Sequence, residues 1–91
     1  MGQWHFEITD IAETDLKRLD PQIQRRIKEK LYLFIENFDS VAPLPLHDPW
    51  RGFFKLRVGD WRIVYEVEPD KKLITIHVID NRDSVYRRRK G

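Results

Sequence analysis

The feature that most constrains the fold is a run of alternating apolar and polar residues, interrupted only by two short turns. The alternation covers residues 53–58, 61–68 and 73–80, and a period of two is typical of half-buried strands. Gly59-Asp60 joins the first two segments, and glycine at the first central position favours a type II′ turn. The sequence PDKK makes the second turn. These segments predict an antiparallel β-meander.

The first half of the chain predicts one more strand and two helices. Residues 4–9 alternate again, and residues 9–19 indicate a short helix with Thr9 or Asp10 as its N-cap. A longer helix of about 17 residues is expected from Pro21, with Asp20 as its cap. Its apolar residues recur at helical spacing. They are Ile23, Ile27, Leu31, Phe34, Ile35 and Phe38.

The predicted order is β-α-α-β-β-β. It describes an α+β fold in which two N-terminal helices pack on one face of an antiparallel sheet, followed by a short C-terminal helical turn. The first strand must join the sheet, since its apolar face would otherwise be bare. Three prolines in residues 39–50 predict a loop with extended pieces before the meander. Residues 1–91 are expected to form a single domain, because the chain is short and contains no linker or repeat.

Composition excludes several classes of function. The chain has no cysteine, which excludes disulfides and thiolate metal sites. No apolar run approaches the roughly 18 residues that cross a membrane, and the first residues do not form a secretion signal. A cytoplasmic protein without a membrane partner is therefore expected. The three histidines lack ligand spacing and the carboxylates are scattered, so no metal and no cofactor are expected.

The net charge of +2 hides an asymmetry. Residues 1–50 carry six Lys/Arg and nine Asp/Glu, a balance of −3, whereas residues 51–91 carry eleven and six, a balance of +5. A polyanion is a plausible partner for the basic half, since phosphate contacts need clustered cations. Charge runs at chain ends are also often solvated tails, so charge alone leaves both interpretations open.

Alternation assigns part of this charge to one face of the meander. The residues expected to face the helices are Phe54, Leu56, Val58, Trp61, Ile63, Tyr65 and Val67. Lys55, Arg57 and Arg62 then share the opposite, uncovered face. Their repulsion across paired strands is unfavourable unless something anionic compensates it. Glu66 on the same face could do so, which would make this a salt-bridged solvated surface.

Two residues after the last strand favour a phosphate site. Arg82 and Tyr86 are expected at one end of the uncovered face. Arginine presents forked donors to phosphate oxygens, and tyrosine can stack on a base or move a proton. With Lys55 and Arg62 they make a candidate phosphodiester site in which cations stabilise the transition state. His77 lies inside the last strand, where a histidine is more often a packed or cross-strand residue than a catalyst.

The residues 53–88, FFKLRVGDWRIVYEVEPDKKLITIHVIDNRDSVYRR, resemble the RelE/ParE toxin superfamily of bacterial type II toxin–antitoxin systems, and within it the RelE branch. The motifs that carry the resemblance are K-L-R, G-D-W-R-I-V-Y and, further on, R-D-S-V-Y-R. The resemblance covers the whole chain in element order. Two positions depart from the branch. Asp80-Asn81-Arg82 stands where G-H-R is frequent, and Phe53 replaces a strand lysine.

The resemblance implies a metal-independent endoribonuclease, an mRNA interferase that cuts the codon in the ribosomal A site and inhibits translation. The 2′-hydroxyl would attack the adjacent phosphate. By position, Lys55 would be the base or a charge stabiliser, Arg62 and Arg82 would neutralise the phosphate, and Tyr86 would stack on or activate the nucleotide. The further cations expected to bind RNA are Arg51, Arg57, Arg87, Arg88, Arg89 and Lys90.

The resemblance also implies the partners. They are a cognate antitoxin, the ribosome with its mRNA and ribosomal RNA, and operator DNA reached only through the antitoxin. Two alternatives stay open. One is a ParE-like poison of DNA gyrase. The other is a catalytically weak domain that acts through antitoxin binding and autorepression of its operon.

Overall fold

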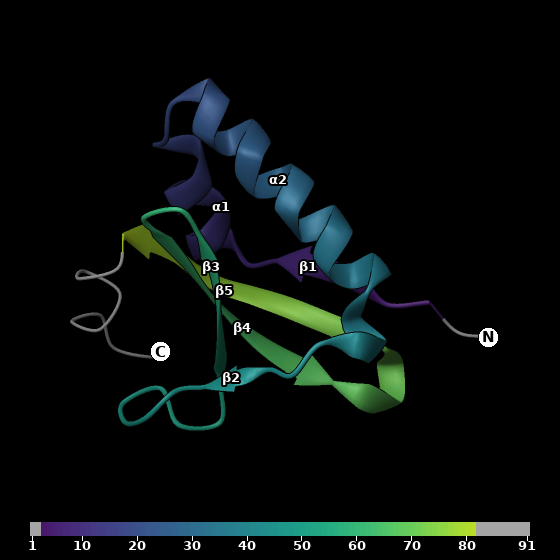
Figure 1. The fold of residues 1–91 in the computed structure, drawn as a ribbon. Helices are drawn as coiled ribbons and strands as arrows, with labels where there is room; N and C mark the ends of the chain where they lie inside the picture. Colours follow the sequence, from purple (N-terminus) through teal and green to yellow (C-terminus); the bar gives the residue numbers. More distant parts are fainter. Residues whose placement is uncertain (1–2, 82–91) are drawn as a thin grey trace.

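The computed structural model describes residues 3–81, which fold into a sheet with two α-helices on one side (Figure 1). The elements are β1 (His5–Ile8), α1 (Asp10–Lys17), α2 (Pro21–Glu36), β2 (Leu44–Pro45), β3 (Phe54–Val58), β4 (Trp61–Glu68) and β5 (Leu73–Asn81). Short 3-10 helices at Phe38–Ser40 and Pro69–Lys71 complete the chain trace. The predicted order is confirmed, with β2 as an addition, whereas the predicted C-terminal helical turn lies outside the described residues.

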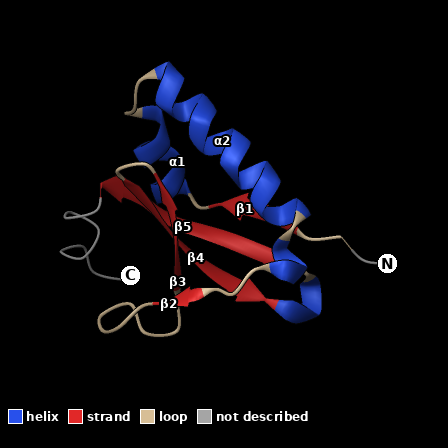
Figure 2. Ribbon diagram, in the orientation of Figure 1, coloured by secondary structure: helices blue, strands red, loops and turns tan. Residues whose placement is uncertain are grey.

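The strands are arranged in the order β1-β5-β4-β3-β2 (Figure 2). Strands β2 to β5 pair antiparallel with their neighbours, as predicted for the meander. β1 instead pairs parallel with β5, with His5 opposite Leu73 and Ile8 opposite Ile76. The sheet is therefore mixed, and the prediction of an antiparallel sheet holds only for the meander. Alternation reports the face that a side chain occupies and not the direction of its strand, so this pairing could not be read from the pattern.

The two helices begin where the sequence predicts but differ in their caps. Thr9 caps α1, because its hydroxyl oxygen accepts a hydrogen bond from the backbone N–H of Ala12 at 3.2 Å. Asp20 occupies the N-cap position of α2 but makes no side-chain capping hydrogen bond. The predicted Asp20 cap is thus correct in position only. Pro21 follows it at the first helical position, where a missing N–H costs nothing.

Both helices bury their apolar stripes against the same face of the sheet (Figure 1). The buried residues of this core are Ala12, Leu16, Ile27, Leu31, Phe34, Phe38, Val58, Ile63, Tyr65, Ile74, Ile76 and Ile79. The seven residues of β3 and β4 predicted to face the helices all belong to this cluster or pack against it. Neither helix is both long and apolar enough to span a lipid bilayer within the described part of the chain.

Strand β5 contains a β-bulge at His77. Val64 pairs with Val78, whereas the next residue, Tyr65, pairs with Ile76, so β5 has one extra residue. A bulge shifts the alternation by one position. His77 and Val78 therefore both lie on the face of the sheet away from the helices, called the back face below.

The back face is not bare. Leu46 and Trp50 of the proline-rich segment and Phe53, the residue before β3, pack on Val64 and Val78 as a second buried cluster. The rings of Trp50 and Phe53 meet edge to face, with 5.3 Å between their centroids. The prediction of an uncovered face is therefore wrong for its centre. Burying two aromatic rings and a leucine stabilises the loop over the sheet, since each such side chain contributes roughly 1.5–3 kcal/mol.

Candidate nucleic-acid interface

The cations of β3 and β4 lie together on the back face, as alternation predicts. Arg57 of β3 is paired with Arg62 of β4, and Arg62 is paired in turn with Asp80 of β5. Lys55 is paired with Val64, a member of the back-face cluster. Neighbouring strands are about 4.8 Å apart, so long side chains from β3 and β4 can reach a common ligand. This face therefore concentrates positive charge beside one end of the apolar cluster.

Arg62 has the most unusual environment of these cations. Its Nε and Nη1 atoms are buried and have no hydrogen-bond partner within residues 3–81. Arg57, which lies opposite Arg62 on β3, is also positively charged and therefore does not neutralise it. Unsatisfied buried donors cost about 1–3 kcal/mol each, and more when charged. The side chain is therefore suited to an anion with two acceptor oxygens, as in a phosphate group.

Glu66 pairs with His77 and not with one of the strand cations. Its Oε1 atom lies 3.0 Å from Nε2 of His77, and the ring of Phe53 packs edge-on against the imidazole, 4.9 Å between centroids. The expectation of a cross-strand role for His77 is confirmed by this contact. The sequence suggested that Glu66 neutralises the strand cations. In the structure it instead forms an imidazole–carboxylate pair with His77 on the same face.

The other predicted RNA contacts are less concentrated. Arg57 is exposed, and Arg51 lies in the exposed loop before β3, where its Nε is 3.8 Å from Oδ1 of Asp48. The remaining members of the predicted site lie outside the described residues. They are Arg82, Tyr86, Arg87, Arg88, Arg89 and Lys90. The structure thus brings together Lys55, Arg57 and Arg62, and leaves the C-terminal members as predictions.

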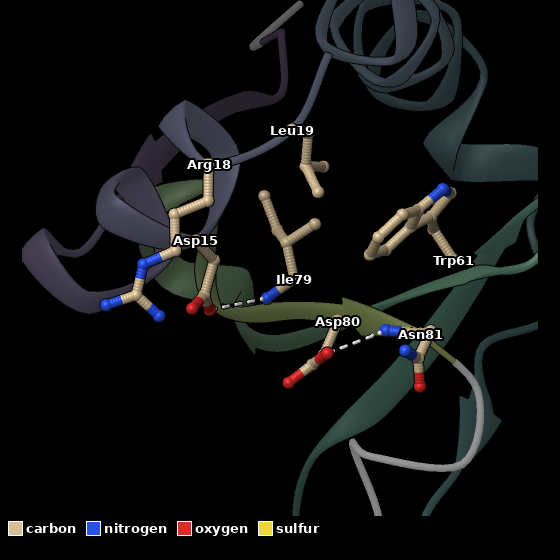
Figure 3. A pocket seen from close by; sticks show the side chains of 7 residues that line it. All are labelled: Asp15, Arg18, Leu19, Trp61, Ile79, Asp80 and Asn81. Atoms are coloured by element: carbon tan, nitrogen blue, oxygen red, sulfur yellow. Dashed lines mark hydrogen bonds between the residues drawn. The ribbon is translucent and has the colours of Figure 1, made fainter.

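A pocket of about 510 Å³ opens where β5 ends beside α1 (Figure 3). Asp15 of α1 lies in its wall and is buried, and its Oδ2 accepts the backbone N–H of Ile79 at 3.0 Å. Trp61 and Asn81 line the opposite side. Sequence reasoning missed Asp15, although its position beside Leu16 in a short apolar stripe was a signal that it faces the sheet. The carboxylate ties α1 to β5 two residues before the strand ends at Asn81.

The described titratable groups limit the available chemistry. Burial raises the pKa of the Tyr65 phenol to about 12, so it stays protonated at neutral pH, packed against the rings of Phe34 and Phe54. Across residues 3–81, no three His, Cys, Asp or Glu side chains gather into a candidate metal site. The back face therefore offers ammonium, guanidinium, imidazole and carboxylate groups.

Comparison with known proteins assigns the family. The family model for the ParE toxin of type II toxin–antitoxin systems matches residues 6–86. The chain belongs to this family. Toxin RelE of Mycobacterium tuberculosis is 30% identical over 84 residues, which are 92% of this chain and 87% of the relative. Toxin RelG of the same organism is 28% identical over 80 residues, which are 88% and 92% of the two chains.

Solved structures support the same fold for this toxin. A RelBE toxin–antitoxin complex from Mycobacterium tuberculosis aligns with a TM-score of 0.78 at 24% identity, covering 89% of this chain and 100% of the other. A RelE mutant from E. coli in the free state aligns with a TM-score of 0.72 at 16% identity, covering 91% and 87%. The protein is a RelE/ParE-superfamily toxin of a type II toxin–antitoxin system, as the sequence resemblance indicates.

Proposed function

We propose that this toxin is a ribosome-dependent mRNA endonuclease that cuts RNA at the basic part of its back face. The observation that carries the proposal is the guanidinium of Arg62, whose Nε and Nη1 atoms are buried and find no partner within residues 3–81. Lys55 and Arg57 on the neighbouring strand add positive charge to the same face. The relatives named RelE and RelG favour this activity over others in the family.

The proposed reaction is an attack of the 2′-hydroxyl on the adjacent phosphate in the A-site codon. It leaves a 2′,3′-cyclic phosphate and a 5′-hydroxyl, inhibits translation and acts in the cytoplasm. Arg62 holds the phosphate and Lys55 stabilises the charge that develops on it. Arg82 and Tyr86 complete the proposed site from the C-terminal segment, one as a second phosphate ligand and the other stacked on the nucleotide. The whole chain, residues 1–91, acts as a single domain.

A purified translation system with a defined mRNA tests this proposal. Primer extension should reveal breaks in the message only when ribosomes, mRNA and the toxin are all present. Arg62→Ala should lower the cleavage rate by about 100-fold or more, as expected for the loss of one electrostatic stabiliser. Lys17→Ala is the matched control, since Lys17 lies on α1 and pairs with Glu13 at 3.4 Å. Absence of ribosome-dependent breaks with the unmodified toxin would refute the nuclease.

The second candidate function is poisoning of DNA gyrase, because the matched family is named for the ParE toxin. Trapping of DNA gyrase cleavage complexes by the purified toxin, together with intact mRNA in the translation system, would support that candidate. Harmless expression of the toxin without any antitoxin would instead favour a catalytically weak domain that acts through antitoxin binding and operon autorepression.

We further propose an acidic, apolar antitoxin segment as the occupant of a groove at the β3 edge. The groove, about 240 Å³, is lined by Lys30 and Phe34 of α2, residues 41–44, residues 55–57 and Tyr65. β2 pairs only with Phe54 and Lys55, so the β3 backbone at Arg57 has no strand partner on that side within the described sheet. An extended peptide could add as a strand there. Basic side chains beside an apolar floor favour acidic and apolar residues in that peptide.

Support for antitoxin binding comes from the solved neighbours, several of which are toxin–antitoxin complexes. The groove is tested by coexpressing the toxin with its cognate antitoxin. Lys30→Glu and Leu44→Asp should each weaken the complex and restore growth inhibition. Lys28→Glu, on α2 but outside the groove, is the charge-matched control. An equal loss of binding with the control would exclude the groove as the docking site.

A further inference from the structure

The imidazole–carboxylate pair on the back face is not part of the residue set proposed above. Nε2 of His77 and Oε1 of Glu66 are 3.0 Å apart, with side chains 28% and 43% exposed. The pair lies at the β5 bulge, where His77 and Val78 both occupy the back face. β-Bulges are frequent next to active sites, where they redirect a side chain. Solvent access and a fixed partner are what a proton-transfer group requires.

The sheet register places this pair close to the basic residues. Val64 stands directly between Val78, the neighbour of His77 in β5, and Lys55 in β3. Two strand spacings amount to roughly 10 Å between main chains. Val64 and Val78 lie between them under the buried Leu46, Trp50 and Phe53, so a ribose-phosphate that contacts both Lys55 and His77 has to follow the border of this cluster. Phe53, which contacts the imidazole at 4.9 Å between centroids, leads directly into β3. His77 and the cations Lys55 and Arg62 therefore border the same apolar cluster on the back face.

The hydrogen bond to Glu66 fixes how the imidazole can act. A carboxylate only accepts hydrogen bonds, so Nε2 of His77 must carry the proton that it donates to Glu66. In the neutral imidazole the other nitrogen, Nδ1, then has the lone pair. A carboxylate in this position also stabilises the imidazolium that forms when Nδ1 takes up a second proton. The pair is therefore arranged as a general base with its orienting group.

We propose that His77 is the general base of the RNA-cutting reaction and that Glu66 is its positioning residue, an inference that rests on the proposed function. Nδ1 of His77 accepts the proton of the 2′-hydroxyl as the 2′-oxygen bonds to phosphorus. The bond from phosphorus to the 5′-oxygen breaks, and water protonates the leaving oxygen. The imidazolium then returns its proton to solvent. Lys55 and Arg62 serve as charge stabilisers, so neither has to lose a proton.

Several ionisable groups lie around His77 on this side of the sheet. The ionisable residues of the surrounding elements on this side are His5 and Glu7 of β1, Lys55 and Arg57 of β3, Arg62, Glu66 and Glu68 of β4, Asp80 of β5 and, in the loop before β3, His47, Asp48 and Arg51. Glu66 is the member that contacts the imidazole in the described structure. Because a base acts in its neutral form, the cleavage rate should rise with pH and then level off.

The test is the pH–rate profile of single-turnover mRNA cleavage in the purified translation system. His77→Gln should lower the plateau rate by about 100-fold and remove the rise with pH. Glu66→Gln should cause a smaller loss, since it leaves the base in place but no longer fixes its tautomer. His5→Gln is the matched control, because His5 is exposed in β1 and outside this pair. Circular dichroism and melting temperature of each variant report whether the fold is retained.

A second measurement is independent of cleavage. Long-range nitrogen–proton NMR correlations of the toxin should assign His77 to the Nε2–H tautomer, and Glu66→Gln should change that tautomer population. An Nδ1–H tautomer would overturn the proposal. So would an unchanged pH profile in His77→Gln when Arg62→Ala abolishes cleavage, a result that would leave the nuclease itself intact. Toxin that never cuts mRNA would instead refute the nuclease and the base together.

Discussion

Two side chains with buried polar atoms have opposite roles in this fold. The carboxylate of Asp15 accepts the backbone N–H of Ile79 and so ties α1 to β5. The Nε and Nη1 atoms of Arg62 are buried without a hydrogen-bond partner in the described chain. Native proteins satisfy nearly all buried polar groups, and exceptions are frequent where a ligand supplies the partner. Arg62 is therefore expected to lower the stability of the free toxin while it serves RNA binding.

Replacing Arg62 tests this conflict. Arg62→Met keeps most of the side-chain volume and removes the unpaired donors, so the free energy of unfolding should rise by about 1 kcal/mol. RNA cleavage should be lost in the same variant. Urea unfolding of both proteins measures the difference, with Asp15→Ala as the contrasting variant that should lose about 1–3 kcal/mol. Destabilisation by Arg62→Met would show that the guanidinium is satisfied in the free toxin.

The buried phenol of Tyr65 should make the free energy of unfolding depend on pH in the alkaline range. Burial raises its pKa from 10.0 to about 12 in the folded protein, so the folded state favours the neutral phenol. The resulting stability is complete below pH 10 and is lost as the pH rises from about 10 to 12, because the unfolded phenol ionises first. The loss is roughly 3 kcal/mol, since one pKa unit corresponds to about 1.4 kcal/mol. Tyr65→Phe should lack this part of the alkaline decrease in urea unfolding, whereas Tyr32→Phe, at an exposed position, should retain it.

At the scale of elements, the helix α1 depends on one capping contact. Its eight residues are too few for an isolated helix, and the Thr9 hydroxyl satisfies the backbone N–H of Ala12 at 3.2 Å. Thr9→Ala should therefore lower the free energy of unfolding by about 1 kcal/mol, and Thr9→Ser should restore most of it. Thermal unfolding of the three proteins measures this. Equal losses in both variants would point to the threonine methyl group and not to the cap.

The elements also show how far the sequence could predict the structure. Alternation assigned the faces of β3 and β4 correctly, and Gly59 has the positive φ, +60°, that the predicted type II′ turn needs. Strict alternation failed in β5 after His77, since a bulge inserts a residue that no turn signal marks. The loop over the back face was also missed, because its buried Leu46 and Trp50 are spaced irregularly between prolines. The contact between Glu66 and His77 depends on the register between β4 and β5, and the residue pattern of a single strand does not encode that register.

At the scale of the whole molecule, the structure shows on which face the charges of the two halves of the sequence lie. The acidic first half of the sequence contributes the helices on one face, while Lys55, Arg57 and Arg62 of the basic half lie on the other face. Since phosphate contacts release counterions, affinity for RNA should fall steeply with salt. The sequence alone could equally describe a solvated surface; the unsatisfied guanidinium of Arg62 is the structural feature that favours a ligand.

The salt dependence of RNA binding tests this location directly. For a short single-stranded RNA, each lost phosphate contact should reduce the slope of log affinity against log salt by about 0.7. Arg57→Ala and Arg62→Ala should each produce that change, and the double variant should produce about twice as much. Lys71→Ala removes the same charge from a residue that pairs with Glu68 at 3.4 Å, so its slope should match the unmodified toxin. Equal slopes in all variants would mean that RNA binds elsewhere, because a cation that releases no counterion contacts no phosphate.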